Sequence, residues 1–270
     1  MIPKIIHYCW FGRGAMPASA YKCIDSWKKF LPDYEIKLWN EDNFDVNIIP
    51  YTREAYEAKK FAFVSDFARF WVLHKYGGLY FDTDVEVIRP LNDIIERGPF
   101  MGCERNVNPV PGGECTCAVA PGLGLGVNPG LGLYKEIIEF YSSLHFTLSE
   151  NGMPPKTIVD HTTSVLCRHG LKATNDIQLC AGVWIYPKEY FAPKDVDTHK
   201  LEITNNTRTI HHYDASWAEW YDKAAGIRGI KLRKILGQRI GNFINVIIYE
   251  IQKRGLQSLI RKAFHRLVRR

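Results

Sequence analysis

One stretch decides how this chain folds: Gly77-Gly78-Leu79-Tyr80-Phe81-Asp82-Thr83-Asp84-Val85-Glu86-Val87. Its two glycines are typical of the end of a helix, because glycine adopts the left-handed conformation at no steric cost. The apolar residues after them favour a buried strand. Side chains alternate along a strand, so Asp82 and Asp84 are expected to point to the same side of it.

The carboxylates of Asp82 and Asp84 would repel each other on a buried strand unless a cation lay between them. Oxygen ligands favour a hard ion, Mg²⁺ or Mn²⁺. Such an ion usually keeps part of its coordination shell for phosphates, so a diphosphate is the expected companion. The alternative is a solvated Asp-Thr-Asp turn, because this triplet is common by chance.

Size and composition are those of an ordinary globular protein. The 270 residues suffice for one large or two small domains with a sizeable core. The chain begins without a long apolar segment, and the run 243–249 is too short to span a bilayer, so we expect neither a signal peptide nor a membrane span. The seven cysteines are odd in number and include no Cys-x-x-Cys pair, which favours reduced cytosolic thiols over disulfides or zinc.

Positive charge is concentrated in residues 223–270, which hold 13 Lys and Arg against one acid, Glu250. Apolar residues recur there at near-helical spacing, so we expect a body over residues 1–222 and a basic amphipathic helical tail. Such a helix suits an anionic membrane surface, and residues 227–270 are the expected contact. One alternative is a solvated basic helix packed on the body. Nucleic acid is the other, and no reader motif accompanies the charge, so we expect no nucleic-acid partner.

The residues before the glycine pair predict an alternating α/β order. Residues 3–10 and 34–39 favour strands and residues 18–30 favour a helix, which is the opening of a parallel sheet. Thr52 is expected to cap a long helix over residues 53–76. Later helices are expected over residues 91–96, 131–144 and 154–167, and later strands over residues 100–103, 117–121, 182–186 and 207–213.

Two groups of side chains near the aspartates are candidates for binding a ligand. Trp10 ends the first strand, where an aromatic ring can stack on a base, and His7 lies beside it. The alternative for both is core packing. Ser65, Asp66 and Arg69 share a helix face, where an acid and an arginine could hold a sugar hydroxyl and a phosphate. The alternative there is a surface ion pair worth about 0.2–0.5 kcal/mol.

A Gly122-x-Gly124-x-Gly126 run lies within residues 104–132, which are rich in Gly, Pro and Asn. It lacks the strand-to-helix context of a dinucleotide fingerprint, and no acid follows at the required distance. We therefore expect a mobile loop that could close over a substrate.

A histidine pair, His211 and His212, follows a late strand. The two side chains are expected to point in opposite directions, so one of them could supply a third metal ligand. The alternative is a structural pair, and periodicity does not decide between these interpretations.

Seven segments occur in a fixed order along the chain: Ile2-Pro3-Lys4-Ile5-Ile6-His7-Tyr8-Cys9-Trp10-Phe11-Gly12, Ser26-Trp27, Pro32-Asp33-Tyr34-Glu35, Leu38-Trp39-Asn40, Phe63-Val64-Ser65-Asp66-Phe67-Ala68-Arg69, Tyr76-Gly77-Gly78-Leu79-Tyr80-Phe81-Asp82-Thr83-Asp84 and His211-His212-Tyr213-Asp214-Ala215-Ser216-Trp217. Together they resemble glycosyltransferase family 32, the D-x-D group of bacterial capsular and lipopolysaccharide sugar transferases and yeast initiating mannosyltransferases. The resemblance is strong over residues 1–100, patchy over 104–205, and returns near 207–217.

The resemblance implies a GT-A fold, which is a Rossmann-like, mostly parallel α/β sheet flanked by helices with the nucleotide-sugar at its carboxyl edge. It implies a retaining transfer from a nucleoside diphosphate sugar, assisted by Mn²⁺ or Mg²⁺. We expect a hexose or N-acetylhexosamine from a UDP-sugar, with GDP-mannose as the alternative donor. The expected acceptor is a saccharide or lipid-linked saccharide of bacterial surface polysaccharide synthesis, at the cytoplasmic face of the cell membrane.

The resemblance also implies roles for individual residues. The implied catalytic residues are Asp82, Asp84 and Arg69, and the implied metal ligands are Asp82, Asp84 and His212. The implied donor-binding residues are His7, Trp10, Ser65, Asp66, Arg69, Tyr80, Asp82, Ser216 and Trp217. The segment Pro154-Pro155-Lys156-Thr157 matches the family's middle motif only loosely, which leaves Asp160 and His161 on the acceptor side without a role.

Two other classes of protein fit the same residues. A non-catalytic, membrane-docked binder of saccharides or nucleotide-sugars would keep the fold without the chemistry. A protein-modifying, toxin-like transferase would share the donor side. Mn²⁺-dependent hydrolysis of UDP- and GDP-sugars distinguishes an enzyme from the binder.

Overall fold

The computed structural model describes residues 1–107, 117–147, 156–195, 198 and 200–214, and short stretches between 228 and 252. Contacts divide the chain into two compact units, Met1–Asp214 and Ala215–Arg270. The predicted division between residues 222 and 223 stays a prediction. The helices and strands of the first unit are β1 (Ile5–Cys9), α1 (Ala18–Phe30), β2 (Glu35–Trp39), α2 (Pro50–Glu57), α3 (Phe61–Tyr76), β3 (Gly78–Tyr80), β4 (Val85–Val87), α4 (Asn92–Arg97), β5 (Phe100–Gly102), β6 (Leu125–Val127), α5 (Gly132–Ser142), α6 (Ile158–Arg168), β7 (Gln178–Cys180), β8 (Val183–Tyr186), α7 (Lys188–Phe191) and β9 (Thr209–His211).

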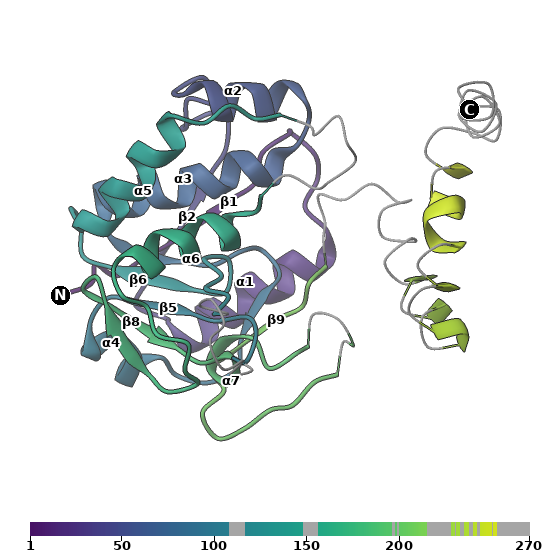
Figure 1. Ribbon diagram of the computed structural model, residues 1–270. Helices are drawn as coiled ribbons and strands as arrows, with labels where there is room; N and C mark the ends of the chain where they lie inside the picture. Colours follow the sequence, from purple (N-terminus) through teal and green to yellow (C-terminus); the bar gives the residue numbers. More distant parts are fainter. Residues whose placement is uncertain are drawn as a thin grey trace. The chain divides into compact units, whose positions relative to one another are not determined.

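Seven strands form the central sheet in the order β2-β1-β3-β6-β5-β8-β7 (Figure 1). β1 is parallel to β2 and β3, and β5 is parallel to β8. β6 is antiparallel to β3 and β5, and β7 is antiparallel to β8. Five strands therefore share one direction while β6 and β7 oppose it, which confirms the predicted mostly parallel sheet. A second, two-stranded sheet pairs β4 with β9.

The predicted β-α-β opening is confirmed. β1 and β2 pair in parallel along their whole length, and α1 spans the predicted residues. Trp27 anchors this helix, because its fully buried indole Nε1–H donates to the carbonyl oxygen of Val85 at 2.8 Å. The Trp10 N–H donates to the Trp39 carbonyl oxygen at 2.9 Å, so the chain leaves β1 and β2 at the same edge of the sheet.

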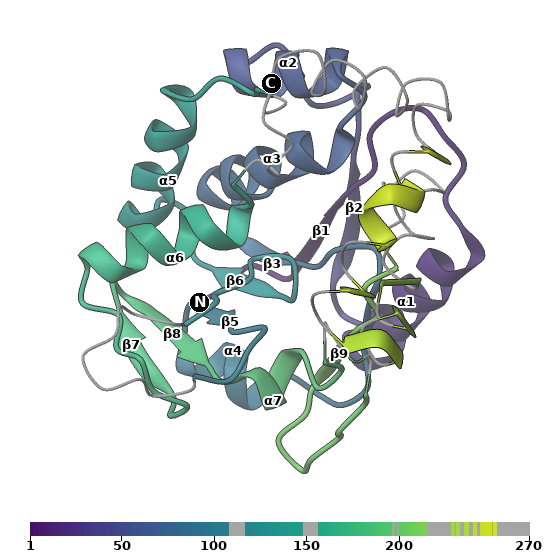
Figure 2. The same cartoon turned by 45° about the vertical axis from the view of Figure 1, so that its right-hand side comes forward.

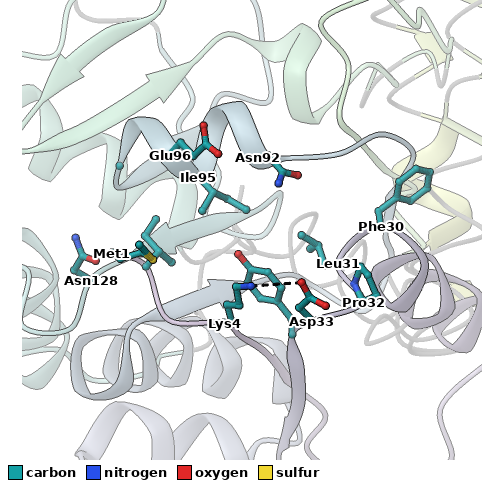
Figure 3. Close-up of a pocket in the computed structure, with 13 residues that line it drawn as sticks. Met1, Lys4, Phe30, Leu31, Pro32, Asp33, Asn92, Ile95, Glu96 and Asn128 are labelled. Atoms are coloured by element: carbon teal, nitrogen blue, oxygen red, sulfur yellow. Dashed lines mark hydrogen bonds and ion pairs between the residues drawn. The ribbon is translucent and has the colours of Figure 1, made fainter.

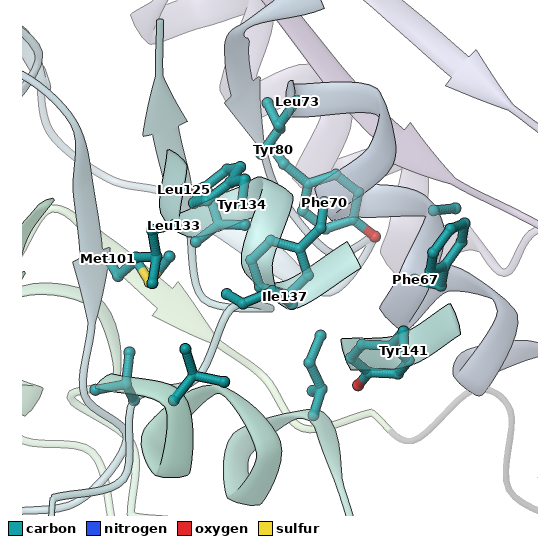
Figure 4. Close-up of a cluster of buried hydrophobic side chains, with 14 of the residues drawn as sticks. Phe67, Phe70, Leu73, Tyr80, Met101, Leu125, Leu133, Tyr134, Ile137 and Tyr141 are labelled. Atoms are coloured by element: carbon teal, nitrogen blue, oxygen red, sulfur yellow. The ribbon is translucent and has the colours of Figure 1, made fainter. Parts of the chain in front are cut away.

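Apolar side chains fill both faces of the sheet in two separate clusters. One cluster packs α3, α5 and α6 against the sheet (Figure 4), and the other packs α1, α4 and α7 against it. Alternation along the strands explains the division, because Leu79 belongs to the second cluster and its neighbour Tyr80 to the first. Figures 1 and 2 show these two sets of helices on opposite sides of the strands.

The stretch that predicts one strand forms two short strands instead. β3 ends at Tyr80 and β4 begins at Val85. Between them the Asp82 N–H donates to the Gly122 carbonyl oxygen (3.1 Å) and the Val85 N–H donates to the Asp82 carbonyl oxygen (3.0 Å). The backbone therefore turns and passes from the central sheet to the two-stranded sheet. The expectation that a single strand carries Asp82 and Asp84 is wrong, and both residues lie in the turn.

The long helix predicted over residues 53–76 is divided into α2 and α3. Lys59 lies in the break with a φ of 57°, a left-handed conformation that does not continue a right-handed helix. Thr52 lies inside α2, where its hydroxyl donates to the Ile49 carbonyl oxygen at 3.0 Å, so the predicted capping role is wrong.

The prediction of a mobile loop over residues 104–132 is wrong for the part that holds the glycine run. Residues 119–127 are buried, and β6 lies between β3 and β5 in the central sheet. The strand predicted over residues 117–121 is reduced to an isolated bridge between Cys103 and Val119. Residues 108–116 lie outside the described residues.

The remaining predicted elements of the first unit are confirmed with shifted ends. α6 begins at Ile158 behind a capping box, in which the Thr157 hydroxyl and the Asp160 carboxylate each bind the other's backbone N–H. The predicted start of this helix at Pro154 and Pro155 lies outside the described residues.

The second unit is helical where the structure describes it. Ile235, Ile240 and Val246 expose 76%, 58% and 59% of their surface, which leaves apolar groups on this unit without a cover among the described residues. The Arg228 guanidinium donates to Asn245 Oδ1 (2.9 Å) and Gln252 Oε1 (3.0 Å). Across the described parts of the chain, every helix is too short or too polar to cross a bilayer.

The buried hydroxyl of Tyr134 gives a test of the core (Figure 4). Tyr134 is fully buried between α3 and α5, and its oxygen has no hydrogen-bond partner among the described residues. An unpaired buried hydroxyl costs free energy, so Tyr134→Phe is expected to raise the free energy of unfolding by about 1 kcal/mol. Urea denaturation measures this change. Tyr80→Phe is the control, because that hydroxyl donates to Asp82, and an equal loss of stability in both variants would contradict the prediction.

Candidate active site

Three candidate residues lie just after the carboxyl ends of three neighbouring parallel strands. Trp10 follows β1, Glu41 follows β2, and Asp82 follows β3. β1 pairs in parallel with both neighbours, so these three ends lie at one edge of the sheet. Open parallel sheets bind ligands at this edge.

Asp82, Asp84 and His211 form a cluster that could hold a metal ion. Each offers one ligand atom, and these atoms all lie within 4.8 Å of one another. The pairing of β4 with β9 sets the cluster, because it places His211 opposite Val85, the residue after Asp84. Two carboxylate oxygens and one imidazole nitrogen suit a divalent cation.

The contact between Asp84 and His211 is the closest in the cluster. His211 Nε2 lies 3.1 Å from Asp84 Oδ1, and the Asp214 N–H donates to Asp84 Oδ2 at 3.0 Å. Burial disfavours charge on both groups, yet their mutual attraction outweighs it. The pKa of Asp84 is therefore lowered and the pKa of His211 is raised.

His212 faces away from this cluster. Its Nε2 lies 2.9 Å from Glu86 Oε2, and its backbone N–H donates to the Asp84 carbonyl oxygen at 2.9 Å. The expectation that the two histidines point in opposite directions is met, and the structure places His211 beside the aspartates. The third metal ligand that we propose is therefore His211, in place of the His212 that the resemblance implies.

A buried arginine joins α3 to this cluster. Arg69 is 3% exposed, and its Nη2 lies 2.9 Å from Asp66 Oδ1 and 3.3 Å from Asp82 Oδ1. Burial raises the pKa of Asp66, and the Arg69 charge opposes that rise. The surface ion pair considered from the sequence is thus excluded, because Asp66 and Arg69 both lie in the interior.

Tyr80 fixes Asp82 from a second side. The Tyr80 hydroxyl donates to Asp82 Oδ1 at 2.9 Å, and the Arg69 guanidinium lies over the Tyr80 ring at 4.9 Å from its centre. Ser65 contributes its backbone, because its carbonyl oxygen accepts from Arg69 Nε at 3.1 Å, while its hydroxyl donates back to Phe61.

The loop after β1 carries Trp10 at this edge. Trp10 is partly exposed, and its indole N–H donates to the Gly14 carbonyl oxygen at 2.7 Å. Glu41 anchors the loop, since its Oε1 accepts from the Gly12 N–H (2.6 Å) and the Tyr56 hydroxyl (2.9 Å). Sequence reasoning missed Glu41. The available signal was its position just after β2, since Trp10 lies just after the neighbouring β1.

His7 lies in the core below this edge. Trp39 Nε1–H donates to His7 Nδ1 at 3.0 Å, and His7 Nε2 lies 2.9 Å from the Gly77 carbonyl oxygen. Burial lowers the pKa of His7 to about 4. Both ring nitrogens thus bind other groups of the protein. His7 is therefore packed in the core, which was the alternative to a binding role.

Four further residues named from the sequence lie apart from the cluster or beyond the described residues. Ser216 and Trp217 fall outside the described residues. Asp160 caps α6, and His161 packs against the rings of Phe140 and Tyr141.

A pocket of about 640 Å³ lies at the other edge of the sheet (Figure 3). Lys4 precedes β1, Tyr34 precedes β2 and Asn128 follows the antiparallel β6, so these lining residues mark the amino edge of the parallel strands. Two of the lining residues form an ion pair, with Lys4 Nζ 3.4 Å from Asp33 Oδ2. The pocket contains no residue of the Asp82 cluster.

Comparison with known proteins gives a family match over the part of the chain that contains Asp82 and Asp84. Residues 17–101 match the family model described as the glycosyltransferase sugar-binding region containing the DXD motif. Asp82 and Asp84 fall inside the matched region and form its Asp-x-Asp triplet. Residues 17–101 are therefore similar to the sugar-binding region of DXD glycosyltransferases, and the metal cluster includes the triplet of that region.

Two relatives support the same class. The chain is 32% identical over 102 residues to inositol phosphoceramide mannosyltransferase 3 of Schizosaccharomyces pombe, and 33% identical over 107 residues to the uncharacterized glycosyltransferase L373 of Acanthamoeba polyphaga mimivirus. The matches cover 35% and 37% of this chain, and 27% and 43% of the relatives. The chain thus spans less than half the length of these relatives, and its matched part resembles the DXD glycosyltransferases, as the sequence predicts.

A solved structure, the PaToxG glycosyltransferase, is similar over 62% of this chain and 69% of its own, at 19% sequence identity and a TM-score of 0.44.

The two histidines give a matched test of the metal cluster. His211→Ala is expected to weaken Mn²⁺ binding by about tenfold or more, because it removes one of three ligand atoms. His212→Ala is expected to bind Mn²⁺ like the wild type, because His212 pairs with Glu86. Titration followed by the paramagnetic resonance signal of free Mn²⁺ measures both affinities. Equal weakening in the two variants would contradict the assignment.

Proposed function

We propose that this chain is a metal-dependent, retaining glycosyltransferase. It moves a hexose or N-acetylhexosamine from a nucleoside diphosphate sugar to a saccharide or lipid-linked saccharide in bacterial surface polysaccharide synthesis, such as capsule or lipopolysaccharide. The observation that carries the proposal is the cluster of Asp82, Asp84 and His211 beside the buried Arg69. The two aspartates and Arg69 lie inside the matched sugar-binding region. Retention and the polysaccharide role rest on the family resemblance.

The donor set fits a divalent cation, Mn²⁺ or Mg²⁺, on Asp82, Asp84 and His211. A bound cation would supply positive charge to the diphosphate as it leaves the sugar. Asp84 presents one oxygen toward His211 and is held by the Asp214 N–H through the other, so its carboxylate is fixed before a ligand arrives. Preorganised charge of this kind needs little rearrangement during the reaction.

Side chains along the same edge would hold the rest of the donor. Trp10 stacks on the nucleobase from the loop that Glu41 anchors. Asp66 and Arg69 bind the donor sugar from α3, next to Ser65 and Tyr80.

The transfer step needs no protein nucleophile in this proposal. An acceptor hydroxyl attacks the anomeric carbon on the face from which the diphosphate departs. The bond from that carbon to the phosphate oxygen breaks, and the departing oxygen takes the hydroxyl proton. Arg69 remains charged throughout and orients the donor.

The nucleobase and the sugar of the donor can be determined by a direct experiment. A UDP-sugar is the favoured donor from the resemblance. GDP-mannose is the alternative, and it gains weight because two relatives of this chain carry the name inositol phosphoceramide mannosyltransferase. Screening UDP- and GDP-sugars for Mn²⁺-dependent hydrolysis decides between them.

The second unit supports a place at the cytoplasmic face of the cell membrane. Residues 223–270 carry a strong positive charge, and Ile235, Ile240 and Val246 expose apolar surface. Basic residues near anionic headgroups contribute about 1 kcal/mol each. Peripheral attachment would bring the site close to a lipid-linked acceptor.

Removing one carboxylate tests the catalytic role. Asp84→Asn is expected to lower Mn²⁺-dependent sugar transfer or donor hydrolysis by about two orders of magnitude, because the neutral amide no longer balances the cation. Circular dichroism checks that the fold is retained. The control is Glu86→Gln two residues later, which alters a partner of His212 and is expected to stay near the wild-type rate.

A near-normal rate in Asp84→Asn would contradict the metal assignment. Silence of the wild type across the whole donor panel, with binding retained, would favour the non-catalytic binder.

Membrane attachment has its own test. Deleting residues 227–270 is expected to abolish co-sedimentation with vesicles that contain anionic lipid, because the basic charge and the apolar residues of the tail are both removed. The full chain on neutral phosphatidylcholine vesicles is the control and is expected to stay in the supernatant. Unchanged sedimentation of the deletion variant on anionic vesicles would contradict the proposal.

A further inference from the structure

One residue of the glycine run, Gly122, lies against the metal cluster. Gly122 is buried directly behind Asp82, and its carbonyl oxygen accepts the Asp82 N–H at 3.1 Å. A Cβ atom at Gly122 would lie 2.1 Å from Asp82 Oδ2 and 3.3 Å from Arg69 Nη1. A methyl group at this position therefore cannot coexist with the Asp82 carboxylate where the structure has it.

The need for glycine at this position is steric. Gly122 is not among the glycines with positive φ, so its backbone conformation is open to other residues. The other two glycines of the run have different constraints. Gly124 has a φ of 150°, and a Cβ atom at Gly126 would lie 2.1 Å from the Phe100 ring in the core. Gly122 alone of the three borders the metal cluster.

We propose that Gly122 is a positioning residue of the metal site. The Asp82 carboxylate occupies the space that a side chain at position 122 would fill. This inference rests on the proposed cation at Asp82, Asp84 and His211. It adds a determinant of that site which lies outside the Asp-x-Asp triplet.

The groups around Asp82 show which atom would move. Arg69 is held by Asp66 and by the Ser65 carbonyl oxygen, so the guanidinium is not free to retreat. Asp82 is a short side chain with 28% of its surface exposed, so it can rotate away from a methyl group. Arg69 then keeps its pair with Asp66, which lets the chain stay folded. Alanine at position 122 should therefore displace the carboxylate and leave the chain folded.

The primary test compares two alanine variants. Gly122→Ala is expected to weaken Mn²⁺ binding by about tenfold or more, because one of the ligands is turned aside. Gly132→Ala is the control, since no atom lies within 4 Å of a Cβ atom at that glycine. Paramagnetic resonance of free Mn²⁺ gives both affinities without a donor, and melting temperatures report the fold. Wild-type Mn²⁺ affinity in a folded Gly122→Ala variant would overturn the inference.

A double-mutant cycle keeps the inference testable if Gly122→Ala folds poorly. Asp82→Ala removes the carboxylate that the methyl group would strike, so Gly122→Ala is expected to lower the melting temperature less in the Asp82→Ala background than in the wild type. An equal loss in the two backgrounds would overturn the inference. This cycle needs no metal, so it separates a failure of the inference from a failure of the proposed function, which would appear as absent Mn²⁺ binding in the wild type.

Discussion

A buried positive charge constrains the geometry of this site. Arg69 is almost fully buried, and an arginine in the interior is costly unless carboxylates pair with it. Its two partners come from different elements: Asp66 lies one turn earlier on α3, and Asp82 lies beyond β3. Moving either element would remove one of the two carboxylates that pair with this buried charge. The end of the strand is therefore tied to the helix that precedes it, and this tie gives the Asp82 carboxylate a fixed place.

The cluster depends on contacts between distant parts of the chain. Asp82 follows β3 of the central sheet, whereas Asp84 precedes β4 of the two-stranded sheet. His211 comes from β9, and Gly122 comes from the segment before β6. The break between β3 and β4 is thus what brings the two sheets to one site, because a continuous strand would keep both aspartates in the central sheet.

Residue spacing in the sequence predicted those parts of the fold that depend on interactions between residues close in the chain. The helix Ala18–Phe30 was predictable from its apolar spacing, and Asp66 with Arg69 from their separation on one helix face. The break at Lys59 carries no glycine or proline, so nothing in the sequence marks it. Alternation predicted that His211 and His212 diverge. Which of them meets the aspartates depends on the register of β9 against β4, a tertiary contact that no local pattern encodes.

Charge balance at this edge links the cation to the donor in the proposed function. Asp82 and Asp84 bring two carboxylates to the cluster. Arg69 beside them supplies one permanent positive charge, which it shares with Asp66. A nucleoside diphosphate is itself an anion, and it would be repelled by carboxylates that no cation neutralises. A divalent cation on those carboxylates changes the sign of the interaction. The donor should therefore bind together with the cation or after it, and the acidic cluster by itself should select against the bare nucleotide.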